Sequence, residues 1–172
     1  GYREFVKNGL SCPLATGKGF FSEKYSLGKT KAACLGTGFD AAFLKENKIR
    51  HMVCDGLLPL AQGCWALGGI RRKRAFETIP KRFVLREQGT WVQDYFQDEI
   101  CLILEENGEL IVIVGCSHPG ILNILDTVRE RFSQPIRAVI GGTHLVKAGP
   151  ERIAKTIAEI KGMGIRLLGF NH

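Results

Sequence analysis

Three of the four histidines in this chain lie in the same local pattern, G-x-x-H directly after an apolar run. They are His118, His144 and His172. Glycine lets the backbone turn sharply and approach a ligand closely, and neutral imidazole is a common ligand of zinc that suits iron as well. A single histidine after a strand is more often a satisfied polar residue than a ligand. Three histidines in matching positions favour a shared metal-binding or catalytic function.

The first of these histidines follows a predicted hairpin. Residues 100–105 predict a strand, Glu106-Asn107-Gly108 is a turn signal, and the β-branched run at 110–114 is typical of a strand buried on both faces. A helix is expected after His118, because apolar residues recur there at helical spacing. Those residues are Ile121, Leu125, Val128 and Phe132.

The other two histidines follow later strands of the same unit. Residues 138–140 predict a strand before His144, and residues 165–168 predict another before His172. Between them a second helix begins at Pro150. Its apolar face would carry Ile153, Ile157 and Ile160. This order implies parallel strands joined by right-handed crossovers, and neighbouring strands lie ~4.8 Å apart, so the histidines should converge.

The preceding part of the chain has a different character. Residues 1–95 are glycine-rich and weakly periodic, with a short helix predicted at 39–47 and short strands with long loops elsewhere. We therefore expect an α/β fold in which residues 1–172 form one partial domain. Its loop-rich segment is 1–95, and its βαβαβ segment, which carries the histidines, is 96–172.

Several residues near the histidines could support a metal site. Cys116 could be a thiolate ligand, a nucleophile or a residue that supports His118, although a small residue at a tight turn is its more ordinary role. Asp94, Asp98 and Glu99 precede a strand. They could orient a histidine through its second ring nitrogen, or simply form a turn and the rim of the site. We take Asp98 and Cys116 as the candidate supporting residues.

Other residues with reactive side chains carry less weight. His51 and Cys54 could chelate an ion, but a surface or packing role is favoured because no matching neighbours accompany them. Gly17-Lys-Gly19 is too short for a phosphate-binding loop. The six cysteines form no C-x-x-C pair, which favours thiols in a reducing cytoplasm over a disulfide framework.

The chain is basic, with a formal net charge of +7 and a pI of about 9.2. Its densest cluster is Arg71-Arg72-Lys73-Arg74. Such a cluster can be a solvated loop, can hold an anionic substrate, or can bind nucleic acid. No helix-turn-helix, zinc-finger or RNA-binding signature accompanies it, so nucleic acid is the least favoured partner. No apolar run approaches the roughly 20 residues of a membrane span, so we expect no membrane partner.

Several motifs together resemble one branch of the metallo-β-lactamase superfamily. They are Val114-Gly-Cys-Ser-His-Pro-Gly-Ile-Leu-Asn123, Ala138-Val-Ile-Gly-Gly-Thr-His-Leu145, Leu67-Gly-Gly-Ile-Arg-Arg72 with Phe76-Glu77, Asp94-Tyr-Phe-Gln-Asp98, and Gly169-Phe-Asn-His172. That branch includes the dihydropterin-methyl-ribofuranosylaminobenzene phosphate synthases, which are linked to methanopterin biosynthesis. The resemblance covers nearly the whole chain and implies an αββα sandwich with metals between loops at one edge.

Two parts of that family's pattern are not found in this sequence. The family's first metal motif, HxHxDH, is absent, and Gly1-Tyr-Arg-Glu-Phe-Val-Lys7 resembles the segment directly after it. The chain stops at His172, where family members continue with Cys-Thr-Gly, and it does not begin with Met. We therefore expect a truncated domain, an αββα sandwich without the N-terminal part of its sheets.

The resemblance also implies a chemistry. His118 and His172 match metal ligands of the family, and His144 matches a motif histidine that is either a ligand or a supporting residue. The implied cofactor is a divalent metal, zinc first, with iron or manganese as alternatives. A metal-bound hydroxide would attack an anionic, phosphate-containing substrate, held by Arg71 and Arg72. A synthase reaction and hydrolysis of a phosphodiester or another ester both fit this chemistry.

Different functions remain open for the isolated chain. Because it holds three candidate ligands at most, we expect it to bind metal weakly or to stay empty, and to turn over little. One alternative is a non-catalytic binding module that uses its basic cluster for nucleic acid or an acidic partner. Another is a scaffold that completes its site with a separate segment carrying HxHxDH, or that assembles as a homo-oligomer.

Overall fold

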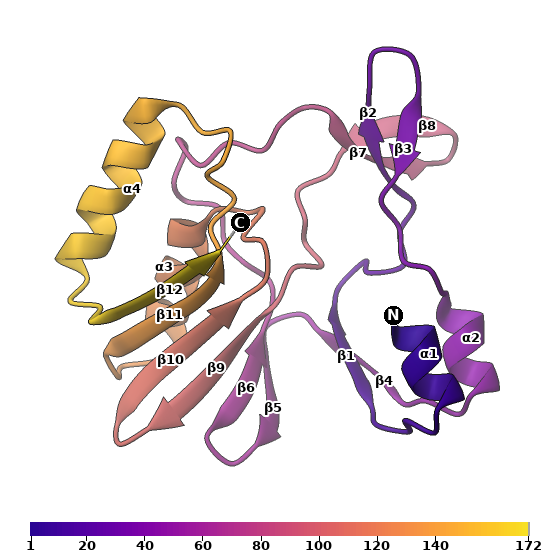
Figure 1. Ribbon diagram of the computed structural model, residues 1–172, viewed down its shortest axis with the longest axis horizontal. Helices are drawn as coiled ribbons and strands as arrows, with labels where there is room; N and C mark the ends of the chain where they lie inside the picture. Colours follow the sequence, from indigo (N-terminus) through magenta and orange to yellow (C-terminus); the bar gives the residue numbers. More distant parts are fainter. Residues whose placement is uncertain (172) are drawn as a thin grey trace.

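The computed structural model describes residues 1–171, and its largest element is a six-stranded mixed sheet (Figure 1). The strands lie in the order β12-β11-β10-β9-β6-β5. Their bounds are β5 Leu57–Ala61, β6 Cys64–Leu67, β9 Cys101–Glu106, β10 Glu109–Val114, β11 Ile136–Gly142 and β12 Leu167–Asn171. β10, β11 and β12 run parallel to one another, while the remaining pairs are antiparallel. The predicted βαβαβ unit is therefore confirmed.

The β9–β10 hairpin forms at its predicted turn. Asn107 and Gly108 both have positive φ, 54° and 75°, as a two-residue turn between right-twisted strands requires. β10 alternates between buried and half-buried residues, so the prediction that it is buried on both faces is wrong. Val112 and its alternate neighbours join the core that contains α3, whereas Ile111 and Ile113 lie on the opposite, less covered face.

Two helices connect the parallel strands, α3 (Ile121–Arg131) and α4 (Pro150–Gly162). The apolar positions predicted within α3 are fully buried: Ile121, Leu125 and Val128. α4 buries Thr156 and Ile160, but Ile157 is 48% exposed. The prediction that Ile157 lies on the buried face is therefore wrong. The reason is the position of α4, which covers the sheet next to β12, and β12 is an edge strand exposed along its length.

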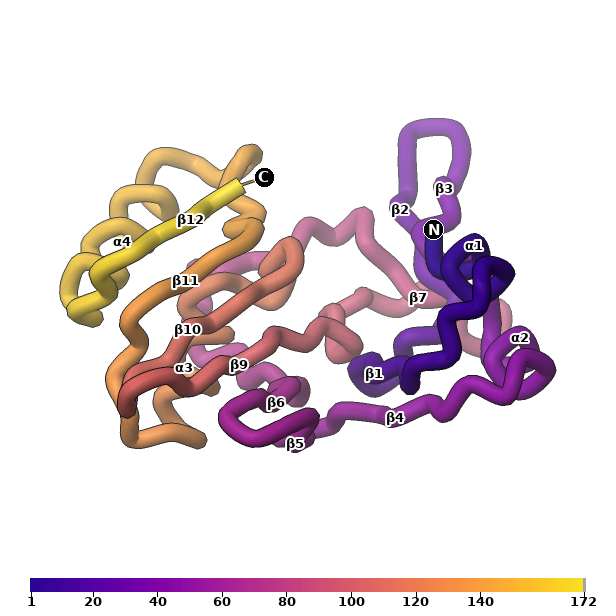
Figure 2. Tube along the Cα trace, turned by 60° about the horizontal axis from the view of Figure 1, so that its bottom comes forward, coloured from indigo at the N-terminus to yellow at the C-terminus, as the bar shows by residue number. Residues whose placement is uncertain are grey.

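Two smaller sheets and two short helices make up the rest of the chain, at the end of the molecule opposite α4 (Figures 1 and 2). One sheet pairs β1 (Leu14–Gly17) with β4 (His51–Cys54), and the other has the order β3-β2-β7-β8, with β2 Lys24–Leu27, β3 Ala32–Cys34, β7 Phe83–Glu87 and β8 Thr90–Gln93. The helices are α1 (Tyr2–Lys7) and α2 (Ala41–Glu46), and α2 matches the helix predicted at 39–47. Among the helices of the described chain, each is too short or too polar to cross a bilayer.

The earlier part of the chain contributes directly to the large sheet. β5 and β6 both precede residue 95, yet β6 pairs antiparallel with β9. A second junction lies where β1 ends, because a Cβ at Gly17 would stand 2.2 Å from the carbonyl oxygen of Asp98. Only glycine allows this close approach of two backbones. The loop that contains Asp98 is therefore held between β1 and the start of β9.

Candidate metal centre and adjoining cavity

β10 and β11 end side by side, and each is followed by one of the predicted histidines. The imidazole rings of His118 and His144 have their centroids 4.6 Å apart, and both residues are half-buried. The two rings meet because parallel neighbouring strands end at the same edge of the sheet, as the sequence predicted. The third predicted ligand, His172, lies outside the described residues.

The glycines of the two G-x-x-H loops allow these loops to touch. A Cβ at Gly141, where φ is 129°, would stand 2.0 Å from the carbonyl oxygen of Val114. The N–H of Gly142 donates to the carbonyl of Gly115 at 2.7 Å, and the hydroxyl of Ser117 donates to the carbonyl of Gly142 at 2.6 Å. The backbone thus binds the two histidine loops to each other.

Three non-glycine residues around the histidine pair adopt left-handed backbone conformations. They are Phe96 (φ 52°), Ser117 (φ 61°) and His144 (φ 51°). For an L-residue this conformation costs about 1–2 kcal/mol. The surrounding contacts must therefore hold each of the three loops in place.

A carboxylate holds His118, and it belongs to Glu99. Its Oε2 lies 2.7 Å from Nδ1 of His118 and accepts the backbone N–H of the same residue at 3.0 Å. Its Oε1 accepts the backbone N–H of Ser117. A carboxylate at Nδ1 fixes the orientation of the ring and leaves Nε2 to bind a metal. The chain thus uses Glu99 where we predicted Asp98.

Asp98 instead shares a buried lysine with Asp94. Nζ of Lys24, on β2, forms a short ion pair with Asp98 and lies 3.8 Å from a carboxylate oxygen of Asp94. Asp94 also accepts the backbone N–H of Phe96 at 2.7 Å. The phenyl ring of Phe96 stacks on His118, with the ring centroids 4.2 Å apart and an interplanar angle of 9°. The lysine and the two aspartates therefore fix the loop that presents this ring to the histidine.

Cys116 lies in the loop after β10 and is half-buried. Burial raises the pKa of its thiol, and the negative charge of Glu99 raises it further. A raised thiol pKa suits a small, half-buried residue at a tight turn. The further prediction that Cys116 supports the metal site stays a prediction.

His51 has a packing role, as the sequence favoured. Its Nε2 lies 2.8 Å from the hydroxyl oxygen of Thr16, and its ring meets the ring of Phe21 edge-on. Within residues 1–171, no three His, Cys, Asp or Glu side chains come together as a complete metal site would require. A structural zinc ion takes four ligands, and among the described residues the two candidate histidines that come together are His118 and His144.

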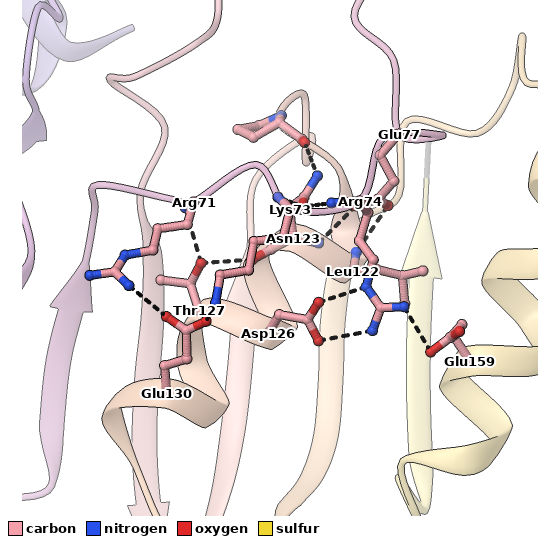
Figure 3. Close-up of polar contacts among 11 residues, drawn as sticks. Arg71, Lys73, Arg74, Glu77, Leu122, Asn123, Asp126, Thr127, Glu130 and Glu159 are labelled. Carbon is pink, nitrogen blue, oxygen red and sulfur yellow. Dashed lines mark hydrogen bonds and ion pairs between the residues drawn. The ribbon is translucent and has the colours of Figure 1, made fainter.

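The basic cluster Arg71-Arg72-Lys73-Arg74 is largely engaged in ion pairs with α3 and α4 (Figure 3). The pairs are Arg71 with Glu130 (3.4 Å), Lys73 with Glu130, and Arg74 with Asp126 (2.7 Å) and Glu159 (3.0 Å). Arg72 differs, because its guanidinium lies 5.1 Å from the ring centroid of Tyr95. The substrate contacts predicted for Arg71 and Arg72 stay predictions.

Two buried polar residues that the sequence analysis missed fix the same segment. The carboxylate of Glu77 accepts the backbone N–H groups of Leu122 and Asn123, at 3.0 Å and 2.7 Å. Burial raises the pKa of Glu77, and these two hydrogen bonds offset part of that effect. The side-chain oxygen of Asn123 accepts the N–H groups of Lys73 and Arg74, both at 2.8 Å. Hydrogen bonds from these two side chains thus join the first turn of α3 to the loop before Glu77 (Figure 3).

A cavity of about 410 Å³ lies beside His144 and is called the His144 cavity below. Its walls come from the segment between β6 and β7 and from the start of α4. Three basic side chains line it, those of Arg82, Lys147 and Arg152, and none of its described lining residues is acidic. The cavity therefore places His144 beside a region of positive charge.

Comparison with known proteins supports the predicted relationship. No protein-family model matches the chain. It is 36% identical over 117 residues to the 7,8-dihydropterin-6-methyl-4-(β-D-ribofuranosyl)-aminobenzene-5′-phosphate synthase of Methanocaldococcus jannaschii, a match covering 66% of this chain and 40% of the synthase. An uncharacterized protein of the same organism is 36% identical over 73 residues, which cover 42% of this chain and 26% of that protein.

The fold agrees with that of a solved protein, Tm1679, described as a metal-dependent hydrolase of the β-lactamase superfamily. The TM-score is 0.74 at 26% sequence identity, and the match covers 92% of this chain and 59% of Tm1679. The chain therefore belongs to the metallo-β-lactamase superfamily, and the predicted fold class is confirmed. Within the superfamily it is similar to the branch that contains the M. jannaschii synthase. It spans less than two thirds of the length of each of these relatives.

Proposed function

We propose that this protein is a metal-dependent hydrolase that acts on an anionic, phosphate-containing substrate. The observation that carries the proposal is the pair of imidazoles at the ends of β10 and β11, one of them held by a carboxylate at Nδ1. The description of Tm1679 as a metal-dependent hydrolase supports the reaction class, and the name of the M. jannaschii synthase supports a phosphate-containing molecule.

His118 and His144 would hold a divalent ion, with zinc as the first expectation. The contact between Glu99 and Nδ1 of His118 supports this assignment, because such an arrangement would orient Nε2 of the ring as a ligand. When bound, the ion would lower the pKa of a coordinated water to about 7 and polarise the bond to be cleaved.

The residues of the chain would contribute orientation and binding around that ion. Glu99 keeps the ring of His118 in one orientation, and Phe96 covers one face of the same ring. The cations of the His144 cavity would attract a negatively charged substrate toward the metal. Arg72 remains a candidate for a further contact, since it lies on Tyr95, beside the loop that carries Phe96.

Metal binding tests the proposal directly. Zinc content and zinc affinity, the latter by competition with a chelating dye, would be measured for the wild-type chain, His118→Ala and Glu99→Gln. We expect His118→Ala to lose the bound zinc and Glu99→Gln to bind it about 10- to 100-fold more weakly, because an orienting carboxylate contributes that much to metal affinity.

His51→Ala is the matched control, because His51 is a half-buried histidine in hydrogen-bond contact with Thr16 and outside the pair. Its zinc affinity should equal that of the wild type. The same affinity in His118→Ala and His51→Ala would disprove the proposed site. Hydrolysis of bis(p-nitrophenyl) phosphate by the zinc-loaded chain, lost in His118→Ala, would then test the reaction class.

Binding of nucleic acid or an acidic partner through Arg71-Arg72-Lys73-Arg74 is the rival function. The ion pairs with Glu130, Asp126 and Glu159 weigh against it, because they use charges that phosphates would need. Oligonucleotide binding that falls steeply with salt, and that is lost on neutralising the four basic residues, would favour the rival.

A further inference from the structure

We propose that the His144 cavity is the binding site for the phosphate group of a phosphate monoester that has an apolar body. The inference rests on the proposed function in one respect, since it takes the histidine pair as the place of reaction. The cavity has its own basis in its charge, its size and its lining, which are independent of any metal.

The cavity is lined by three cations that come from two segments of the chain. Arg82 comes from the segment before β7, while Lys147 and Arg152 come from the loop and first turn around the start of α4. Arg152 donates one hydrogen bond from Nη1 to the carbonyl of Thr78 at 3.0 Å, and its buried Nε has no acceptor among the described residues. Arginine donors in a fixed fork match the geometry of phosphate oxygens.

One acidic group outside the cavity lining acts on Arg152. It is Glu77, whose two oxygens already accept the N–H groups of Leu122 and Asn123. Another cavity of the molecule makes a useful contrast. It is lined by Lys18 and Lys24 together with Glu87, Asp94 and Asp98, so its charges are mixed. The His144 cavity, by contrast, combines three cations with no carboxylate among its described lining residues.

The size and remaining lining of the cavity indicate what accompanies the phosphate. A volume of about 410 Å³ lies within the range of small-molecule sites, roughly 300–1,000 Å³, and exceeds what a phosphate ion alone would fill. Phe76, Pro80 and Val146 supply apolar surface on its walls. A phosphate with an aromatic or similarly apolar substituent fits both kinds of wall.

Binding of phenyl phosphate to metal-free protein tests this inference. The wild-type chain, kept in excess chelator, would be titrated with phenyl phosphate and separately with phenol, with binding followed by calorimetry or by NMR shifts of residues around the cavity. We expect measurable binding of phenyl phosphate, weaker binding of inorganic phosphate, and none of phenol. Arg152→Gln and Lys147→Gln should each weaken phenyl phosphate binding about tenfold, as the loss of one charge-assisted hydrogen bond does.

Lys161→Gln is the matched control, because Lys161 is an exposed lysine at the far end of α4 and outside the cavity. It removes the same net charge and should leave binding unchanged. Equal weakening in Lys161→Gln and Lys147→Gln would overturn the inference, as would undiminished binding in both cavity variants. Lys147 is exposed, so Lys147→Gln keeps the test valid even if Arg152→Gln does not fold.

The two proposals can fail separately. Loss of metal binding in all forms of the chain, with phenyl phosphate binding intact, would count against the proposed hydrolase and leave the cavity assignment standing. Zinc bound through His118, with no phenyl phosphate binding in the metal-free chain, would support the metal site and overturn the cavity assignment.

Discussion

The loop between β6 and β7 has two halves that use their basic residues in opposite ways. In the first half, residues 70–77, side chains and backbone groups are bound to α3 and α4. In the second half, residues 78–82, Arg82 lies over the ring of Phe83 and pairs with no carboxylate among the described residues. The first half adds only Phe76 to the described lining of the His144 cavity, whereas the second half adds Thr78, Pro80 and Arg82.

This difference shows that a high density of charge in a sequence does not identify the charges that a ligand can use. The cluster Arg71-Arg72-Lys73-Arg74 is the densest in the chain, but three of its side chains face carboxylates of the helices. The cations of the His144 cavity come from two distant segments of the sequence and gather only in the fold. Substitution of the cavity cations should therefore change ligand binding, and substitution of the paired residues in the cluster at 71–74 should change stability.

The largest effect is expected from Glu77→Ala, in the fixed half. This change leaves two buried backbone N–H groups of α3 without an acceptor, and should lower the free energy of unfolding by about 3–5 kcal/mol. Urea unfolding followed by circular dichroism would measure it. Glu151→Ala, at an exposed glutamate on α4, should change stability by less than about 0.5 kcal/mol. If both variants were equally stable, the first half would not be fixed by its buried carboxylate.

A smaller effect is expected from Arg74→Met. The guanidinium is mostly shielded and contacts both Asp126 and Glu159, so its loss should lower the free energy of unfolding by about 1–2 kcal/mol. Arg71→Met should cost clearly less, because the pair of Arg71 with Glu130 is exposed to solvent and screened. The same urea experiment ranks the two variants. The reverse ranking would contradict the assignment of Arg74 as the residue that joins the loop to both helices.

The pH dependence of stability gives a finer test of Glu77. Because burial raises the pKa of Glu77, folding favours its protonated form. Its contribution to stability is therefore full below the ordinary glutamate pKa of about 4.3, and is lost as the pH rises through the raised pKa of the folded state. The stability difference between wild type and Glu77→Gln, measured at successive pH values, should move in favour of Glu77→Gln above about pH 4.3. A constant difference would argue against the raised pKa.

The smallest change in stability is expected from Arg82→Gln, in the second half. The side chain is exposed and outside any ion pair of the described residues, so the free energy of unfolding should change by less than about 0.5 kcal/mol. Thermal or urea unfolding would measure it beside Arg74→Met. A loss as large as that of Arg74→Met would erase the distinction between the two halves.

Much of the βαβαβ unit could be predicted because its apolar residues follow the periods of strands and helices. The runs at 110–114 and 138–140 and the spacing within α3 identified elements that the structure contains. The first half of the chain gave weaker signals, since its strands are three to five residues long and some carry buried polar groups. Lys24, buried on β2 between two aspartates, is one that no hydrophobic pattern could reveal.

The candidate site could be predicted from the sequence only where the topology of the sheet alone decides which side chains come together. Parallel strands bring His118 and His144 together whatever their neighbours are. The choice between Asp98 and Glu99 depends instead on an irregular loop in which Phe96 has a positive φ. Local alternation of side chains does not hold in such a loop, so the sequence could not show which carboxylate faces the histidine.

The sequence contains an indication of the structural role of Glu77. It is part of the Phe76-Glu77 pair noted in the family resemblance, and a glutamate before a proline-containing loop has no obvious partner in sequence. Its partner is the start of α3, where a Cβ at Gly120 would stand 2.2 Å from the glutamate carboxylate. Gly120, immediately before a strongly apolar helix, therefore indicated that another side chain packs against the start of this helix.

The left-handed conformations of Phe96, Ser117 and His144 have a consequence for how the protein responds to heat. Each loop carries a local conformational cost, while the sheet beneath them holds the most buried side chains of the chain. Segments with such a cost open by local fluctuation at lower free energy than the core does. On warming, the three loops should open first and separate the two imidazoles while the strands remain paired. The proposed metal site would then be lost at a temperature at which the protein still keeps its fold.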